Sequence, residues 1–562
     1  MKLHTMKLTL VLLLCTLHAL AGEQPKFFKK ARKTQATLIA YTATGEMRQA
    51  QAVFLDETGN CAAPYDAVKM ATRATLVDAD GKEHQVRYVM GASSLYNAVR
   101  MQSNNTKSNY AEVRKSPLAK GTPVWVMPLA GAEKQAQAYS DTISEAQVFG
   151  EGDFPYYTLS KPADERMAGC PVYDEEGALV GFIQPAARKA DKPAFVLGAA
   201  YVSSLSITTF DANNSDLSAI LIDKALPDDE TQATSYLFLS TRLPDDAYER
   251  LAEQFVERFP HNANGYIQLA ERQVAAKKYK AAEATYSRAL DASTGQVCDI
   301  HHSYAKMLYR TAISATKSTE QEGWTLERAL SEAEAAYAAS PQPLYAALQG
   351  MCLYGLKRYD TALDRFLSLS ATNMRSAEYF AYAAQCKEMM QAPAEEVLAL
   401  QDSAVNIFSK PYPVEAANFL YFRAQTRAKL KQFREAVSDL NEFEHLLSGN
   451  VTAQFCYERE QLEMQCRLFP AALSDIERAV RLAPNEPLFR AEEAVVNYRV
   501  GQLDEAIKAA QEAVRLDDTF ADAHRILGIC LSEKGKKEEA RKSLLRAQEL
   551  GDATAKKILD NL

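Results

Sequence analysis

Cys170 is the residue whose type and setting most directly suggest nucleophilic chemistry. It lies between Gly169 and Pro171, where a short loop enters an apolar run. A thiolate there could attack a carbonyl carbon if a base took its proton, and the usual base is histidine. His84, in the stretch KEHQV, is the only histidine between the N-terminal segment and His261. We expect Cys170 to be a small buried thiol and His84 to be a histidine on the surface of a strand.

Four carboxylates lie near the same loop. Two carboxylates held at a fixed distance could act as general acid and general base. These four stand in stretches that favour turns, so we expect them to be solvated turn residues. The four residues are Asp164, Glu165, Asp174 and Glu175.

The cysteines do not follow a metal-binding pattern. Eight remain when Cys15 is set aside, and none stands in a Cys-x-x-Cys pair or at zinc-ligand spacing. Most have apolar neighbours, where a free cysteine behaves as a small hydrophobic residue. The sequence predicts no metal site and no cofactor, and it leaves any disulfide pairing open.

Short strands are the elements that would position these residues. From about Thr34 to Ser206, apolar residues alternate in brief runs, and the turn Asp-Ala-Asp-Gly at 78–81 marks a hairpin between two of them. Many short strands with no helix between them predict a β-sandwich or barrel. We place this domain at residues 30–210 and a linker at residues 211–232.

Composition limits the classes of partner. The chain has 562 residues, 47% of them hydrophobic and 24% charged, which is typical of a globular protein with more than one domain. The formal net charge is -8, and no basic stripe is present. We therefore expect no nucleic-acid partner and only indirect membrane association.

The first 21 residues have the pattern of a secretory signal peptide. Lys2 and Lys7 precede an apolar run from Leu8 to Leu14, and Ala19-Leu20-Ala21 forms a small-x-small cleavage site. Cys15 follows a bulky leucine, which disfavours its use as a lipid-attachment site. We expect an exported protein that is periplasmic or envelope-associated, with secretion from the cell as the alternative.

The helical half, from about residue 233 to residue 550, repeats with a fixed period. The alanines that open three C-terminal units, Ala472, Ala506 and Ala540, are 34 residues apart. This pattern resembles the tetratricopeptide repeat (TPR), a 34-residue unit of two antiparallel helices with small residues where the helices cross. We expect about eight repeats, with residues 551–562 as a C-terminal capping helix. The crossing residues are Gly528, Gly350, Ala270, Ala282 and Ala424.

The resemblance to TPR proteins implies a concave face, lined by the first helix of each unit, that binds an extended peptide or another protein. Tyrosine and arginine on that face would contribute most to binding. The candidate binding residues are Asn418, Tyr421, Gln425, Tyr457, Gln461, Tyr498, Arg499 and Arg525.

Three stretches of the strand-rich half resemble trypsin-like serine proteases, particularly those of the HtrA type. They are AVFLDETGNCAAPYDAV, DADGKEHQVRYVMGASSLYNAVRM and ERMAGCPVYDEEGALVGF, which occur in the order of the segments around the family's histidine, aspartate and serine. The resemblance implies a double β-barrel. The fold class we expect is therefore multidomain, with a trypsin-like double β-barrel followed by an all-α TPR solenoid.

The same resemblance implies that the catalytic triad is lost. The histidine place falls on Asp66, the acid place on Tyr96 and the serine place on Ala168. An anion, a phenol and a methyl group cannot supply the base, the orienting acid and the nucleophile of the family's mechanism. We expect no catalytic residues at these degenerate triad positions and therefore a pseudo-peptidase.

These expectations favour an exported, non-catalytic scaffold or adaptor. It would bind other exported or envelope proteins, or extended peptides, through the TPR groove and the protease-like domain. Two alternatives stay open: an active serine- or cysteine-type peptidase with an unrecognised catalytic site, and an accessory recognition subunit of an envelope uptake or secretion complex.

Overall fold

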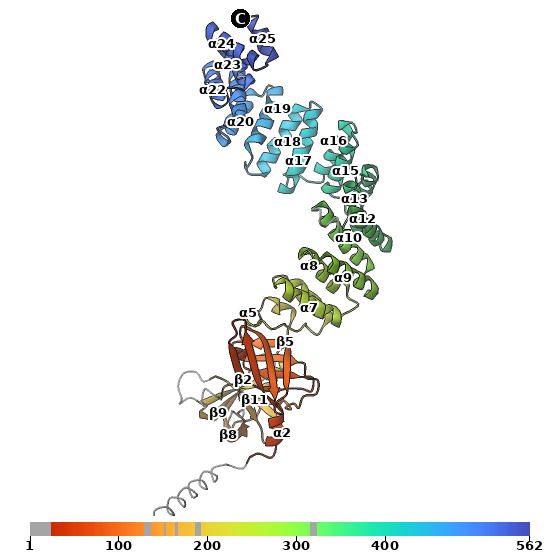
Figure 1. Ribbon diagram of the computed structural model, residues 1–562, viewed down its shortest axis with the longest axis vertical. Coiled ribbons are helices and arrows are strands. Elements are labelled where there is room, and N and C mark those ends of the chain that lie inside the picture. The colour runs from red at the N-terminus through yellow and green to blue at the C-terminus, as the bar shows by residue number, and fades with distance from the viewer. Residues whose placement is uncertain (1–23, 129–136, 151–152, 163–166, 186–192, 315–322) are drawn as a thin grey trace, which may run out of the picture. The chain divides into compact units, whose positions relative to one another are not determined.

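The structure is a computed structural model that describes residues 24–128, 137–150, 153–162, 167–185, 193–314 and 323–562. It divides into two compact units, Met1–Ile300 and His301–Leu562. The first holds all the strands and the helices that follow them, and the second holds only helices among its described residues (Figure 1). The predicted signal peptide, Asp164 and Glu165 lie outside the described residues.

The first six strands close into an antiparallel barrel with the strand order β1-β2-β3-β6-β5-β4. Its interior is filled by side chains such as Leu38, Leu76 and Met101, all without exposed surface. A short helix, α3 (Tyr65–Val68), follows the third strand. The strands are β1 (Gln35–Thr42), β2 (Met47–Phe54), β3 (Asn60–Ala63), β4 (Ala71–Asp78), β5 (Glu83–Ser93) and β6 (Ala98–Ser103).

The next six strands close into a second antiparallel barrel, with the order β10-β11-β12-β9-β8-β7. Its core includes Ile143, Val172 and Val196. A one-turn-and-a-half helix, α4 (Ala199–Ser204), follows the last strand. Two closed six-stranded barrels confirm the predicted double β-barrel. The strands are β7 (Pro123–Val126), β8 (Tyr139–Phe149), β9 (Phe154–Pro162), β10 (Pro171–Tyr173), β11 (Leu179–Ile183) and β12 (Pro193–Gly198).

The segment predicted as a linker is packed against the first barrel. The amide of Val89 in β5 donates to the carbonyl of Asp223, and the amide of Ala225 donates back to the carbonyl of Val89, both at 2.9 Å. The next helices, α6 (Glu230–Leu239) and α7 (Asp245–Arg258), bury side chains such as Phe255 in the same core as the barrel. Backbone pairing and shared apolar burial therefore hold this connection in place.

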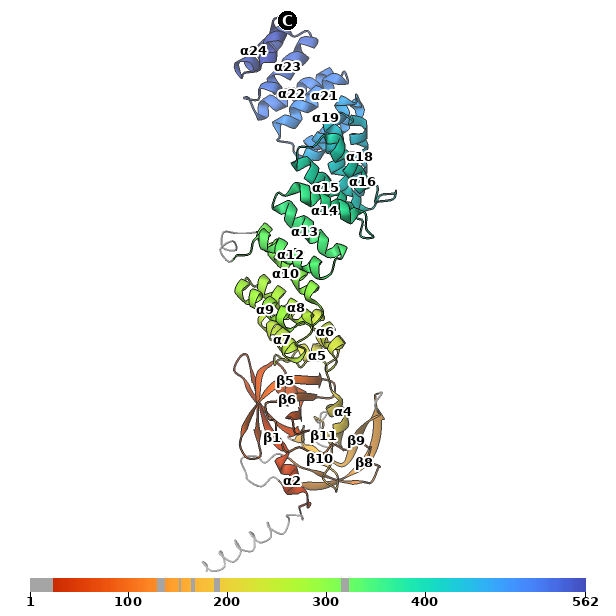
Figure 2. The ribbon, with the colours of Figure 1, turned by 90° about the vertical axis from the view of Figure 1, so that its right-hand side faces the viewer.

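Antiparallel helix pairs make up the rest of the chain, and within the second unit successive pairs lie side by side (Figure 2). In the first unit α8 (Ala263–Ala275) pairs with α9 (Tyr279–Ala292). The remaining helices are α10 (Val297–Ile313), α12 (Leu326–Ala339), α13 (Pro343–Gly355), α14 (Tyr359–Ser370), α15 (Ala377–Met389), α16 (Ala394–Val405), α17 (Ala417–Lys429), α18 (Phe433–Leu446), α19 (Ala453–Gln465), α20 (Phe469–Leu482), α21 (Pro487–Arg499), α22 (Leu503–Leu516), α23 (Ala521–Glu533), α24 (Lys537–Glu549) and α25 (Ala553–Leu559).

Small residues lie where the two helices of a pair cross, as the repeat pattern predicts. A Cβ added to Gly528 in α23 would lie 2.6 Å from Cγ of Leu544 in α24. A Cβ added to Gly350 in α13 would lie 2.7 Å from the ring of Phe366 in α14. Such contacts leave no space for a side chain, so the glycines let the helices approach each other closely.

Candidate functional site

The loops that carry the three predicted triad positions, Asp66, Tyr96 and Ala168, meet in space. Asp66 is the second residue of α3, the short helix that follows β3, and its amide donates to Oδ1 of Asn97 at 2.9 Å. Asn97 follows Tyr96 in the turn between β5 and β6. This hydrogen bond ties the loop of the histidine place to the loop of the acid place.

The loop of the serine place packs on the loop of the histidine place. Gly169, next to Ala168, has φ +80°, and a Cβ added there would lie 2.5 Å from Cγ of Pro64. Its amide donates to the carbonyl of Ile183 in β11 at 2.7 Å. Glycine is required by both the positive φ and the close approach, so the backbone shape of this loop depends on Gly169.

The side chains at these positions pack or face solvent. Tyr96 lies with its ring centroid 4.7 Å from that of Phe149 and 5.2 Å from that of Tyr201, within an aromatic cluster. Asp66 is exposed, and Ala168 is half-buried and offers only a methyl group. The acid place therefore contributes apolar packing instead of a carboxylate that could orient a base.

His84 is on a strand, as predicted, but the expectation that it lies on the surface is wrong. The side chain is buried, with 4% of its surface exposed, and Nε2 lies 2.8 Å from Oδ2 of Asp78. Asp78 also accepts the amides of Asp80 and Lys82 in the β4–β5 turn. His84 and Ser93 lie at opposite ends of β5, and each residue of a strand adds about 3.3 Å to its length. Tyr96 follows the Ser93 end, so His84 is remote from Tyr96.

The structure confirms the predictions for two other candidates near the loop, Cys170 and Glu175, and contradicts the prediction for a third, Asp174. Cys170 is buried in the core of the second barrel, which confirms a small buried thiol. Glu175 is exposed in its turn. The expectation of a solvated residue is wrong for Asp174, which is buried: it accepts the amides of Glu176 and Ala178 and a hydrogen bond from Arg114 at 2.8 Å. Asp174 thus organises the turn and is satisfied there.

The eight candidate binding residues lie on the first helices of four successive pairs, α17, α19, α21 and α23. Hydrogen bonds join each of these helices to the next. Tyr421 donates to Glu458 at 2.8 Å, Gln461 to Glu492 at 3.3 Å and Tyr498 to Glu533 at 3.4 Å. Arg525 donates to Asp552, before α25, at 2.6 Å.

The structure therefore brings these residues into one row, with an acidic partner at each step. Tyr457 is half-buried with its ring 5.5 Å from that of Phe489, while Asn418, Gln425 and Arg499 are exposed. The sequence interpretation missed the partner carboxylates, because it considered each unit separately. The row combines half-buried tyrosine rings with charged and amide groups, a composition suited to binding a polypeptide.

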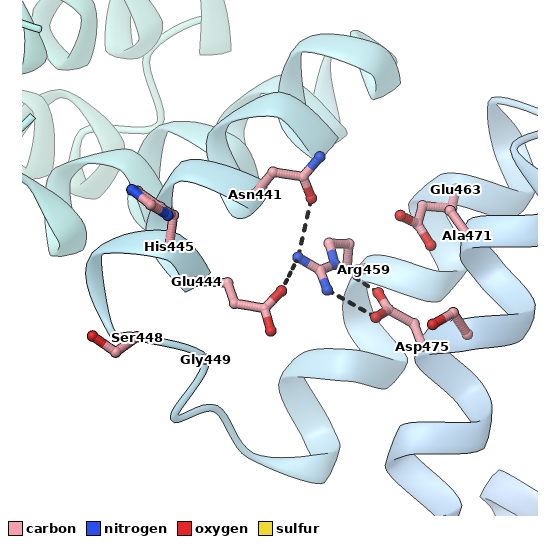
Figure 3. A pocket seen from close by; sticks show the side chains of 10 residues that line it. Asn441, Glu444, His445, Ser448, Gly449, Arg459, Glu463, Ala471 and Asp475 are labelled. Atoms are coloured by element: carbon pink, nitrogen blue, oxygen red, sulfur yellow. Dashed lines mark hydrogen bonds and ion pairs between the residues drawn. The ribbon is translucent and has the colours of Figure 1, made fainter. Parts of the chain in front are cut away.

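A polar pocket of about 520 Å³ lies between α18, α19 and α20 (Figure 3). At its centre is the buried Arg459, which donates through Nε and Nη2 to both oxygens of Asp475 at 2.6 and 2.8 Å. Nη1 donates to Asn441 at 3.0 Å and lies 2.6 Å from Glu444. Glu444 is also bound by Arg478. We call this the α18–α20 pocket.

Two residues that line the pocket, and Glu460 beside them on α19, occupy positions that are apolar or small in another repeat. Counting from the alanines Ala472 and Ala540, Arg459, Glu460 and Glu463 correspond to Leu527, Gly528 and Leu531. That comparison of repeats was the available sequence signal, and it was not used in predicting the site. The Arg459–Asp475 pair recurs one repeat earlier as the buried pair Arg423–Asp439. The departure in the pocket of this unit is therefore Glu463, and such departures often mark functional sites.

Burial shifts the ionisation of these groups. It raises the pKa of Glu460 to about 8, with nearby Glu492 and Glu463 adding to the effect, and it raises the pKa of Glu463 to about 8. Burial disfavours the charged form of Arg459, but the hydrogen bonds and charges of Asp475 and Glu444 outweigh it and the pKa of Arg459 is raised. The pocket therefore contains a charged arginine and a carboxyl group that is mostly protonated at neutral pH.

Comparison with known proteins identifies the repeats at the C-terminal end of the helical half. The tetratricopeptide repeat family model matches residues 462–519 and 492–554. The C-terminal helices form a TPR solenoid. Within it, the match covers the units α21–α22 and α23–α24 and reaches back into α19.

Two curated relatives share short TPR stretches with the chain. A TPR repeat-containing thioredoxin of Arabidopsis thaliana is 37% identical over 76 residues, 14% of this chain and 11% of the relative. The small glutamine-rich tetratricopeptide repeat-containing protein 2 of Mycosarcoma maydis is 32% identical over 77 residues, 14% of this chain and 22% of the relative. The chain thus spans a small part of the length of either relative.

Solved structures similar to the chain include both kinds of fold. The TPR protein YrrB, described as having an unusual peptide-binding site, is 22% identical with a TM-score of 0.30, over 35% of this chain and 98% of its own. The HtrA-type protease AlgW with tripeptide is 13% identical with a TM-score of 0.27, over 31% of this chain and 59% of its own. The Rv3671c protease of M. tuberculosis is 16% identical with a TM-score of 0.28, over 33% of this chain and 86% of its own.

The described residues contain neither a metal-binding cluster nor a membrane-spanning helix. Among them, no cluster of three or more histidine, cysteine, aspartate or glutamate side chains could hold a metal ion. No helix in the described part of the chain combines the length and the apolar character needed to cross a membrane.

Proposed function

We propose that the protein is an exported, non-catalytic scaffold or adaptor that binds proteins or extended peptides through its TPR solenoid. The observation that carries this proposal is the row of tyrosine, amide and arginine side chains along α17, α19, α21 and α23. Half-buried tyrosines such as Tyr421 and Tyr457 can add contact area at little cost in conformational entropy. Export is inferred from the signal-like residues 1–21.

The double barrel would act as a second docking surface and not as a peptidase. Its loops retain the contacts that bring Asp66, Tyr96 and Ala168 together, yet none of the three side chains can supply a nucleophile paired with a base. Cys170 is buried, and His84 is engaged by Asp78 at the far end of β5. These contacts support a domain that has kept its shape for binding.

Activity-based labelling of the full mature chain tests the non-catalytic part of the proposal. We expect neither a fluorophosphonate nor a thiol-reactive probe to label any serine or Cys170 stoichiometrically in the native protein. The denatured chain, in which every thiol is accessible, serves as the positive control. Stoichiometric native labelling that disappears in Cys170→Ala, or in a variant of one serine, would establish an active peptidase instead.

A further inference from the structure

The α18–α20 pocket is separate from the row of candidate binding residues. Its lining comes from the second helices α18 and α20, the turn after α18, and the face of α19 that carries Arg459 and Glu463. None of the eight candidates on α17, α19, α21 and α23 lines it. Its volume of about 520 Å³ falls within the range of roughly 300–1,000 Å³ common for ligand sites. The pocket therefore has room for a long side chain.

Glu463 is the group in this pocket whose hydrogen-bonding capacity is unused. It has 4% of its surface exposed, and its Oε2 is buried with no hydrogen-bond partner among the described residues. In Figure 3 its carboxylate points from α19 toward the space beside Arg459. Arg459, by contrast, donates from each of its three nitrogens, to Asp475 and Asn441, and also pairs with Glu444. A buried polar atom without a partner in a pocket is an acceptor ready for a ligand.

The charges around the pocket determine the sign of that ligand. Arg459 and Arg478 balance Asp475 and Glu444, so an ionised Glu463 leaves one negative charge without a partner. His445, Ser448 and Ser474 line the same space and add acceptor atoms for a donor-rich group. Each nitrogen of Arg459 already faces an acceptor, and an anion in this space would lie beside the carboxyl groups of Asp475, Glu444 and Glu463. The site therefore suits a single positive charge.

We propose that the α18–α20 pocket binds the ammonium or guanidinium group of a basic side chain of a partner polypeptide, with Glu463 as its counter-ion. The choice of a polypeptide as the source of that side chain rests on the proposed scaffold function, whereas the pocket's preference for a cation does not. Binding would ionise Glu463, since a cation stabilises the carboxylate that burial alone disfavours. A proton is therefore released when the pocket is filled at neutral pH.

Titration calorimetry of the full mature chain with N-acetyl-lysine N-methylamide tests this site. The measurement is made at pH 7 in two buffers of different ionisation enthalpy, so that proton release is obtained together with affinity. We expect one saturable site, release of about one proton because Glu463 is mostly protonated before binding, and no saturation by the neutral N-acetyl-norleucine N-methylamide. Glu463→Gln should weaken binding at least tenfold and abolish proton release.

Glu460→Gln is the matched control. Glu460 lies on the same helix, is equally buried and has a pKa raised to the same value, but it does not line the pocket. It should leave affinity and proton release unchanged. Four outcomes would overturn the proposal. Two concern the variants: equal binding by the wild type and Glu463→Gln, or an equal loss of binding in both variants. Two concern the probes: no binding of the lysine probe, or saturation by N-acetyl-glutamate N-methylamide instead. Because the probe is a fragment, these results are independent of whether the row on the first helices captures a partner.

Discussion

The double barrel and the TPR solenoid differ in where they carry polar side chains. In the barrel, the loops of the three predicted triad positions meet, Tyr96 packs in an aromatic cluster, and Ala168 offers only a methyl group. In the solenoid, Arg459 and Glu463 place charge where another repeat has leucine. The comparison teaches that activity has to be argued from the side chains of a site and not from the backbone that positions them, and that departures from what packing requires are the first place to look for function.

The largest effect should come from breaking the buried ion pair of the solenoid. Arg459→Met leaves Asp475 and Glu444 buried with too few partners, and we expect it to destabilise the region by about 3–5 kcal/mol. Adding Asp475→Leu removes one of those carboxylates and should recover part of the loss. Hydrogen exchange of the α19 and α20 amides measures both, and equal protection in the wild type and Arg459→Met would contradict the account.

Stability should fall with rising pH because of Glu460, whose side chain has no exposed surface. Its pKa is about 8 in the folded chain against an ordinary value of 4.5, so both states are protonated below about pH 4.5. Between pH 4.5 and 8 only the unfolded chain releases the proton, and the free energy of unfolding decreases, on the order of a few kcal/mol in total. Glu460→Gln should match the wild type at pH 5 and melt higher at pH 8. A wild-type melting temperature that rises over this range, with no gain in the variant at pH 8, would exclude this role.

In the barrel, the backbone at the serine place should matter more than its side chain. Gly169→Ala would place a Cβ at a position with positive φ and against Pro64. We expect it to lower the free energy of unfolding by about 1–3 kcal/mol. Ala168→Ser, one residue away, should change the free energy of unfolding by less than about 0.5 kcal/mol. It should also produce no peptidase activity, since no base is added. Thermal unfolding and a casein-cleavage assay check both variants, and cleavage by Ala168→Ser would show that a base is present.

The smallest effect is expected along the row of candidate binding residues. Tyr421→Phe removes the hydrogen bond to Glu458 and keeps the ring, so it should cost about 1 kcal/mol or less. Tyr498→Phe, whose bond to Glu533 is longer and exposed, should cost less still. Differential scanning calorimetry of the two variants measures this order, and the reverse order would mean that the hydrogen bonds do not set the geometry of the row.

The sequence predicted the fold better than it predicted the site. Period and composition were enough for the repeats, since they placed Gly528 and Gly350 where the two helices of one unit cross, as the structure shows. His84 and Asp174 were misplaced because their burial depends on partners, Asp78 and Arg114, that only the barrel brings near. The α18–α20 pocket was missed because it is formed by three helices from two adjacent repeats.

The claim that this protein holds its partners without cutting them is tested most directly by capture from its own host. The tagged mature chain and a variant with Tyr421, Tyr457 and Tyr498 changed to alanine are purified under the same conditions, and bound proteins are identified by mass spectrometry of their intact masses. The account predicts a partner that is retained at full length by the wild type and lost from the triple variant. Equal retention by both chains, or recovery of the partner as fragments with newly formed termini, would contradict it.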